Sequence, residues 1–239
     1  EKDRALINRL GFNNHGSEVV SKRISNNQPD GFLGINIGPN KETKNKEEDY
    51  YTCLSRLSMF AGYITINISS PNTEGLRDFH DQGELKKLLS GLNKIINEKK
   101  IECPIALKIS PDIKDDEISK IVDLVSSHNI KGIVVSNTTD SNRDNLFDIK
   151  KHERGGLSGQ PLKDISTNLI KRFYKKTKGK IKIIGVGGVD SGQSAYEKIT
   201  AGADAVQLYT GMVYKGPGIV KEIKKDLVSI LKKENIKNI

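Results

Sequence analysis

Several residue types that define well-known protein classes are scarce in this sequence. Its 239 residues include two cysteines and no tryptophan, and aromatic residues make up 5%. Cys53 and Cys103 are too few and too isolated for a disulfide framework or a zinc site, so a reducing compartment is expected. The four histidines have no ligand spacing with carboxylates or cysteines, and no metal site is predicted. No apolar run approaches the roughly 20 residues that span a bilayer, and Glu1 begins no signal peptide.

The chain is basic, with a formal net charge of +9 and a pI of about 9.3. This charge would permit binding to nucleic acid or to an anionic surface. The lysines, however, lie mainly in helix-like segments among glutamates and aspartates, as at Lys86, Lys94 and Lys224. With few aromatic side chains to stack on bases, solvated helix faces explain the charge better, and no nucleic-acid partner is predicted.

Short apolar stretches alternate with longer amphipathic ones along the chain. The expected strands are residues 31–37, 63–68, 105–109, 132–136, 181–186 and 205–208. The expected helices are residues 18–26, 49–60, 84–99, 115–128, 164–174, 192–201 and 218–232. Such alternation predicts an α/β fold with a parallel sheet, and the lack of two-residue hairpin signals argues against an antiparallel one. Residues 5–14 are expected to form a loop, and residues 155–159 are assigned to no helix or strand.

The strand count leaves two architectures open. A closed (β/α)8 barrel needs eight strands, and about six are found. Either the first two strands of a barrel are missing from this chain, or the sheet is open and doubly wound.

Polar residues or glycines follow each expected strand. They are Asn36; Asn67, Ser70 and Asn72; Lys108; Ser136, Asn137 and Thr138; Gly187 and Gly188; and Tyr209 and Thr210. Because the carboxyl ends of parallel strands meet at one edge, these residues predict a functional site there.

Three of these features have a chemical interpretation of their own. Lys108 lies between apolar neighbours, so its ammonium needs an anionic partner. Gly187 and Gly188 let backbone N–H groups approach a phosphate closely, and the following helix offers its N-terminus. The asparagines supply paired donors and acceptors for a planar amide or imide of a ligand or cofactor.

At these positions the sequence resembles the class 2, quinone-dependent dihydroorotate dehydrogenases. The matching motifs are Ile7–Asn14 (INRLGFNN), Gly34–Gly38 (GINIG), Asn67–Thr73 (NISSPNT), Ser136–Thr139 (SNTT), Gly155–Gly159 (GGLSG) and Ile184–Gly188 (IGVGG). The resemblance implies residues 1–239 are a single FMN-binding domain, a (β/α)8 TIM barrel lacking its first two strands. The implied activity is oxidation of dihydroorotate to orotate in pyrimidine biosynthesis, with electrons passed from FMN to a quinone.

The resemblance also assigns roles to individual residues. Ser70 would be the catalytic base, where class 1 relatives carry cysteine, and Thr73 and Phe12 would complete a proton relay through water. The substrate would be bound by Asn8, Arg9, Leu10, Gly11, Phe12, Asn67, Asn72, Asn137 and Thr138. FMN would be held by Asn36, Asn67, Lys108, Ser136, Gly159, Gly188, Tyr209 and Thr210.

By the same resemblance, a segment that precedes this chain would provide peripheral membrane contact and admit the quinone. The expected location is the cytoplasmic side of the bacterial inner membrane, with the mitochondrial inner membrane as the alternative. Two other functions stay open: a phosphate-binding barrel lyase or aldolase that uses Lys108 as a Schiff-base nucleophile, and a non-catalytic fragment or flavin-binding subunit.

Overall fold

The computed structural model describes residues 2–72, 76, 79, 81–141 and 143–237. The chain forms two compact units. The first, called the β2–β4 unit, comprises Leu10–Ile109 and Lys114–Ile133. The second, called the β7–β8 unit, comprises Glu1–Arg9, Ser110–Ile113 and Val134–Ile239.

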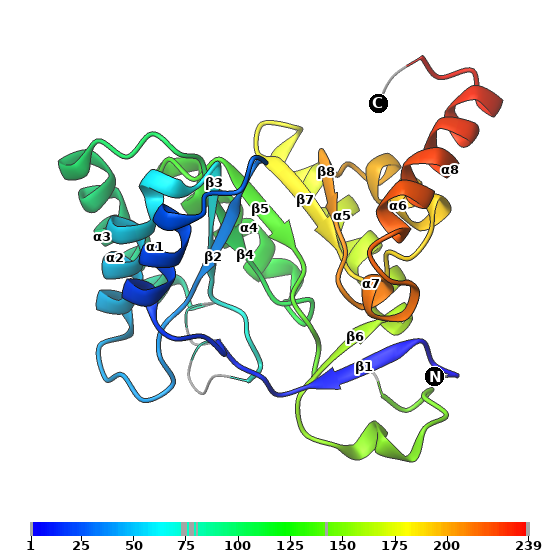
Figure 1. Cartoon of the computed structure of the whole chain (residues 1–239), viewed down its shortest axis with the longest axis horizontal. Helices are drawn as coiled ribbons and strands as arrows, with labels where there is room; N and C mark the ends of the chain where they lie inside the picture. The colour runs from blue at the N-terminus through cyan, green and yellow to red at the C-terminus, as the bar shows by residue number, and fades with distance from the viewer. Residues whose placement is uncertain (1, 73–75, 77–78, 80, 142, 238–239) are drawn as a thin grey trace. The chain divides into compact units, whose positions relative to one another are not determined.

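The β2–β4 unit is a parallel sheet covered by helices (Figure 1). Its strands β2 (Gly34–Ile37), β3 (Tyr63–Asn67) and β4 (Ile105–Lys108) are adjacent in that order, and β5 (Gly132–Val135) begins next to β4. The helices are α1 (Ser17–Asn26), α2 (Lys46–Leu57), the short η1 (Ser58–Phe60), α3 (Gln82–Lys99) and α4 (Asp115–Ser127). The predicted parallel sheet is therefore confirmed in this unit.

The core of this unit follows from the side-chain alternation of its strands. Every second residue of β2, β3 and β4 is a buried aliphatic residue: Ile35, Ile37, Ile64, Ile66, Ile105 and Leu107. The helices contribute matching apolar stripes, for example Leu88 and Leu92 of α3, which are fully buried. Because successive strand residues point to opposite faces, the other face of this sheet is left for the polar residues.

The β7–β8 unit holds a second parallel pair, β7 (Lys182–Val186) with β8 (Ala205–Gln207). The end of β5 lies beside β7, since Ser136 N–H donates to the carbonyl of Val186 at 3.0 Å. The helical segments are η3 (Ile149–His152), η4 (Gln160–Leu162), α5 (Lys163–Thr177), α6 (Gly192–Thr200), α7 (Thr210–Lys215) and α8 (Ile219–Lys233). Helices α6 and α8 pack together around Val189, Ala195, Ile219 and Ile223.

Two predictions about this unit are wrong. Residues 5–8 of the predicted loop form strand β1 (Ala5–Asn8), which pairs antiparallel with β6 (Gly156–Gly159). The partners lie about 150 positions apart in the chain, from Ala5 with Gly159 to Asn8 with Gly156, so no hairpin signal marks them. Helix α7 was also missed, because its six residues are too few for a recognisable period.

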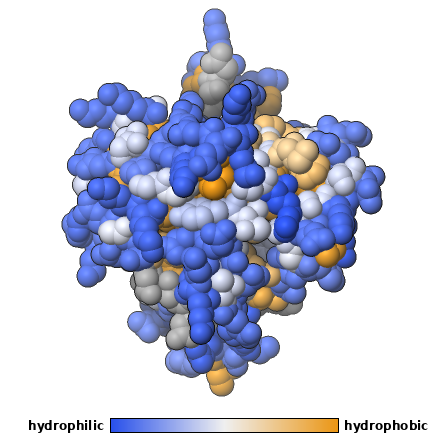
Figure 2. Space-filling view, turned by 90° about the vertical axis from the view of Figure 1, so that its left-hand side faces the viewer, coloured by the Kyte–Doolittle hydropathy of each residue, from blue (hydrophilic) through white to orange (hydrophobic). Residues whose placement is uncertain are grey.

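The surface agrees with the prediction for the lysines. Lys86, Lys94 and Lys224 are exposed on their helices, and the face seen from the side of α1–α3 is mostly hydrophilic (Figure 2). One lysine departs from this pattern, since Lys198 of α6 is fully buried. Across the described residues, no helix combines the length and apolarity needed to cross a membrane.

Candidate active site

In the β2–β4 unit, the strand register brings three predicted cofactor-binding residues to one face of the sheet. Asn36 pairs with Thr65, and Asn67 pairs with Lys108. Thr65 and Asn67 are two residues apart in β3 and therefore point to the same side. Asn36, Asn67 and Lys108 thus share the face opposite the aliphatic core, close to the carboxyl ends of their strands.

Lys108 carries a cationic group in an apolar setting. Burial lowers the pKa of its ammonium, and this burial is the only influence that shifts it. Among the described residues, no carboxylate or other acceptor pairs with its Nζ, so the predicted anionic partner is not one of them. An ammonium held this way favours a ligand that can accept a hydrogen bond or negative charge.

A set of hydrogen bonds fixes the end of β3. Tyr50 of α2 donates its hydroxyl to the carbonyl of Asn67 at 2.6 Å. The side-chain oxygen of Asn67 accepts from the backbone N–H and hydroxyl of Ser69 at 3.2 and 3.3 Å. The Ser69 hydroxyl also donates to the carbonyl of Lys108 at 2.8 Å. This network holds the ends of β3 and β4 in one arrangement.

Ser70, the predicted base, lies directly after this network and is 8% exposed. Its Oγ accepts a hydrogen bond from the backbone N–H of Asn72 at 3.2 Å. A donor at this oxygen stabilises negative charge that develops when the hydroxyl loses its proton. Thr73, the predicted relay residue, lies outside the described residues.

Phe12 is placed against the end of β2. A Cβ atom at Gly38 would lie 2.2 Å from Cζ of the Phe12 ring, so only glycine leaves room for this ring. Leu10 is 64% exposed, and Gly11 has a positive φ of 65°. The predicted substrate segment of this unit therefore turns at a glycine and then docks its aromatic ring on the β2 end.

In the β7–β8 unit, strand β6 connects several of the predicted residues. Asn8 donates from Nδ2 to the carbonyl of Gly156 at 3.3 Å, and Thr210 donates to the Ser158 hydroxyl at 2.8 Å. Gly159 ends this strand, with a φ of 98° and the carbonyl of Arg4 packed behind it. The Gly159 position therefore has room only for a glycine.

The segment after β5 is ordered by its own polar groups. Ser136 donates to the carbonyl of Asn137 at 3.1 Å, and the Asn137 side-chain oxygen accepts from Thr138 N–H at 2.8 Å. Two other predicted residues are more open. Tyr209 is 71% exposed. Arg9 is also exposed, and its guanidinium donates to the carbonyl of Arg154 at 2.8 Å.

The predicted phosphate turn follows β7. Gly187 and Gly188 have φ values of 126° and 68°, which glycine tolerates best. The next helix, α6, was predicted to offer its N-terminal N–H groups to the phosphate. A capping box between Ser191 and Ser194 already occupies part of that N-terminus. The backbone of the glycine pair itself is the better candidate for binding an anion.

Sequence reasoning missed three residues that support this turn: Gln160, Ser166 and Lys198. They contact it only through backbone carbonyls or through one another. For Lys198, a signal was present. It is three residues after Ala195 and three before Ala201, both buried, which places it on the inward face of α6.

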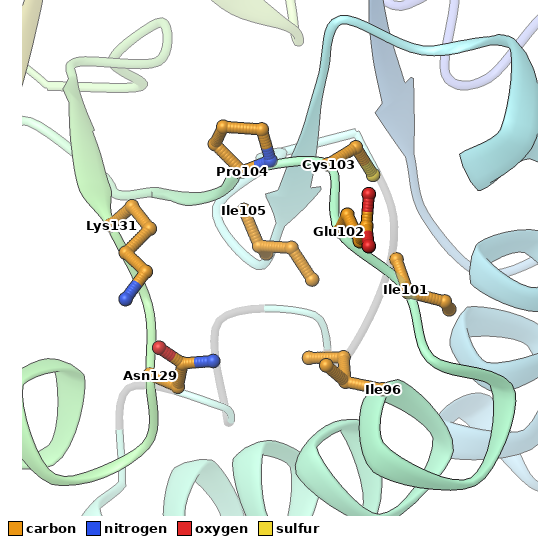
Figure 3. A pocket seen from close by; sticks show the side chains of 8 residues that line it. All are labelled: Ile96, Ile101, Glu102, Cys103, Pro104, Ile105, Asn129 and Lys131. Carbon is orange, nitrogen blue, oxygen red and sulfur yellow. The ribbon is translucent and has the colours of Figure 1, made fainter.

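A separate small hollow lies at the opposite end of β4 (Figure 3). Its volume is about 80 Å³, and it is lined by Ile96, Ile101, Glu102, Cys103, Pro104, Ile105, Asn129 and Lys131. Ile105 begins β4, whereas Lys108 ends it. The hollow is far smaller than a typical cofactor site and is not part of the polar face.

Comparison with known proteins gives a consistent answer. Residues 1–231 match the family model described as dihydroorotate dehydrogenase. The chain is 41% identical over 242 residues to the dihydroorotate dehydrogenase (quinone) of Bartonella henselae, and 42% identical over 243 residues to that of Brucella anthropi. Each match covers 100% of this chain and 67% of the relative.

Solved structures agree with the sequence comparison. The crystal structure of DHODH from Eimeria tenella in complex with ferulenol matches with a TM-score of 0.93 and 36% identity, over 98% of this chain and 70% of that one. The ligand-free form from the same organism matches with the same TM-score. The barrel prediction is thereby confirmed, and the chain spans about two thirds of the length of these relatives.

Proposed function

Because the chain belongs to the dihydroorotate dehydrogenase family, we propose that it oxidises dihydroorotate to orotate with a bound flavin and passes the electrons to a quinone. The single observation that carries this proposal is the polar face of the β2–β4 unit. There the ammonium of Lys108 and the amides of Asn36 and Asn67 share one side of the sheet, and Ser70 follows β3.

The residues fit the flavin that this family uses, and we propose that it is FMN. When bound, a flavin accepts a hydride from the substrate and gains negative charge. Lys108 supplies the positive charge that stabilises such a ring, and its own burial favours a partner that compensates the ammonium. Asn36 and Asn67 provide amide donors and acceptors for the polar edge of the ring.

The remaining FMN contacts are proposed from the β7–β8 unit. Ser136, Gly159, Gly188, Tyr209 and Thr210 are the residues concerned. Gly188 would donate its backbone N–H to the phosphate group. Ser136 is 2% and Thr210 6% exposed, and because their hydroxyls donate to Asn137 and Ser158, each would accept a hydrogen bond from the ligand or exchange its present acceptor for it.

Ser70 would remove the proton from C5 of dihydroorotate while the hydride leaves C6. A serine is a weak base at its ordinary pKa and needs stabilisation of its alkoxide character. The N–H of Asn72 donates to its Oγ and provides part of that stabilisation. Thr73 and Phe12 would hold in place the water that carries this proton away from Ser70. Asn8, Arg9, Leu10, Gly11, Asn67, Asn72, Asn137 and Thr138 would bind the substrate.

The proposal extends to the location of the protein. A quinone is dissolved in lipid, so the electron acceptor must be reached at a membrane. We propose peripheral contact with the cytoplasmic face of the bacterial inner membrane through a segment outside these 239 residues. A mitochondrial inner membrane would meet the same chemical need.

The test is a visible absorption spectrum of the purified protein, before and after anaerobic addition of dihydroorotate. A flavin spectrum that bleaches would support the proposal. A protein that neither contains nor takes up added FMN would contradict it and would favour the non-catalytic alternative. The lyase or aldolase alternative predicts an imine on Lys108, which borohydride would trap; the family match gives that function no support.

A further inference from the structure

Lys198 is the only fully buried lysine among the described residues. Its Nζ donates to the Ser166 hydroxyl at 2.7 Å, to the Thr167 hydroxyl at 2.8 Å and to the carbonyl of Lys163 at 3.1 Å. Three acceptors satisfy the three hydrogens of an ammonium, yet all three are neutral. A buried charge without a counter-ion is costly, so its retention here calls for a functional reason.

The Ser166 hydroxyl connects this ammonium to the glycine turn. Its Oγ lies 3.2 Å from the carbonyl of Gly187 and 3.2 Å from that of Lys163. The Lys163 carbonyl also accepts from the Lys198 ammonium and the Thr167 hydroxyl, whereas among the described residues Ser166 is the side chain that donates to the Gly187 carbonyl. The Ser166 proton is therefore directed to Gly187, completing a chain from the Lys198 ammonium to that carbonyl.

The Gly187 carbonyl belongs to the same peptide group as the N–H of Gly188. A hydrogen bond to the oxygen of a peptide polarises the whole group and makes its N–H a stronger donor. The next peptide group is polarised in the same way, because Gln160 donates from Nε2 to the carbonyl of Gly188 at 3.2 Å. Both carbonyls are thus occupied from the α5 side, and no described residue accepts from the N–H of Gly188.

The glycine pair is packed tightly against the first turn of α5. A Cβ atom at Gly187 would lie 2.8 Å from the Ser166 Oγ, and one at Gly188 would lie 2.6 Å from Cα of Lys163. The first turn of α5 therefore lies directly behind the glycine pair. A shift of that turn would move both peptides together.

We propose that Lys198 is a positioning residue that orients and polarises the Gly187–Gly188 turn for the phosphate of the bound flavin. This inference rests on the proposed function. The buried ammonium does not touch the ligand. It acts through Ser166 and the Gly187–Gly188 peptide, and its charge favours an anion at the far end of the chain.

The charges near Lys198 are consistent with such a role. Lys163 and Glu197 form an ion pair at 3.0 Å and largely cancel each other, and Asp164 lies in the first turn of α5. Burial lowers the pKa of Lys198 to about 8, so the ammonium form predominates at neutral pH. The positive charge therefore has no dedicated carboxylate partner.

The test compares the affinity of the protein for FMN with its affinity for riboflavin, which has the same ring but no phosphate. Lys198→Met removes the charge, and Ser166→Ala interrupts the chain while Lys198 remains. Each variant is expected to bind FMN about tenfold more weakly, as losing a charge-assisted hydrogen bond of about 1.4 kcal/mol predicts, while riboflavin affinity changes less than about twofold. Fluorescence titration measures both.

Thr167→Val is the matched control, since it removes another acceptor of Lys198 without breaking the chain to Gly187. It should leave the ratio of the two affinities unchanged. Equal losses for FMN and riboflavin in Ser166→Ala and Lys198→Met would indicate a merely structural role and overturn the inference, as would unchanged binding of both. If Lys198→Met does not fold, Ser166→Ala decides alone. A wild-type protein that binds neither flavin would overturn the proposed function and the inference with it.

Discussion

Ser70 differs from its neighbour Ser69 in what its hydroxyl does. Ser69 is fully buried, and its hydroxyl forms hydrogen bonds with the Asn67 side-chain oxygen and the Lys108 carbonyl. Ser70 accepts from Asn72 N–H instead and retains its own proton for exchange with a ligand. On the proposed function, Ser69 has a structural role and Ser70 a catalytic one.

Ser70→Ala should slow the reduction of bound flavin by dihydroorotate by about 10²- to 10⁴-fold, the usual contribution of a positioned base. FMN should stay bound, because Lys108 and Asn67 are untouched. Anaerobic stopped-flow absorbance measures the rate. Ser69→Ala is the control, with a rate within a few fold of wild type and a stability loss of about 1 kcal/mol. An unchanged rate in Ser70→Ala would exclude the serine as base.

Lys198 gives a prediction about pH and stability. Burial lowers the pKa of its ammonium to about 8 in the folded protein, from the usual lysine value of about 10.5. Between these values the unfolded chain binds more protons than the folded one, so unfolding becomes harder as the pH rises. The cost of burying the charge is fully present below about pH 8 and is relieved by about pH 10.5.

Wild type should accordingly gain up to about 3 kcal/mol of unfolding free energy relative to Lys198→Met between about pH 7 and pH 10.5. Using the variant as the reference cancels the titration of all other groups. Urea unfolding at each pH measures the difference. A difference that stays constant over this range would mean that Lys198 is not buried as an ammonium at neutral pH.

At the scale of elements, the end of β2 and the ring of Phe12 form one contact. Gly38→Ala would place a methyl carbon only 2.2 Å from Cζ of the Phe12 ring. The ring must move, and the proposed relay moves with it. We expect kcat/KM for dihydroorotate to fall by about 10- to 100-fold with FMN still bound, since small displacements of positioning groups have effects of this size.

Gly31→Ala is the matched control for this change. It lies in the approach to the same strand, and an added Cβ there meets nothing within 4 Å. Its steady-state kinetics should equal those of wild type. If Gly38→Ala also behaves like wild type, Phe12 has no role in positioning the relay.

The elements show why part of the fold was predictable. Strands β3 and β4 and helix α3 can be predicted from their own residues, because the spacing of the apolar residues and the length of each segment indicate the same element type. The β1–β6 pair does not, since each strand is four residues long and its pairing depends on a distant segment. Polar residues at strand ends predicted the shared face of Asn36, Asn67 and Lys108. Gln160 and Ser166, which support the glycine turn, could not be predicted because they bind its backbone carbonyls, whereas the position of Lys198 on the inward face of α6 could have been read from the sequence.

At the scale of the whole molecule, the net charge of +9 acts together with a surface on which both signs are mixed. Lysines on α3, α5 and α8 are exposed, but acidic residues stand among them, for example Glu98 beside Lys94 at 3.8 Å. An anionic membrane is attracted by the net positive charge of such a surface only at distances over which the individual positive and negative charges are averaged. This attraction reaches no farther than about one Debye length. Salt shortens that distance from about 30 Å at 0.01 M to about 8 Å at 0.15 M.

Sedimentation with lipid vesicles tests this. With anionic vesicles, these 239 residues should sediment at about 0.01 M salt and be released at about 0.15 M, because only long-range attraction holds them. Neutral vesicles are the control and should bind little at either salt concentration. Binding that resists salt would contradict the proposal of a membrane contact outside these residues, and would instead require an apolar surface within them that inserts into the bilayer.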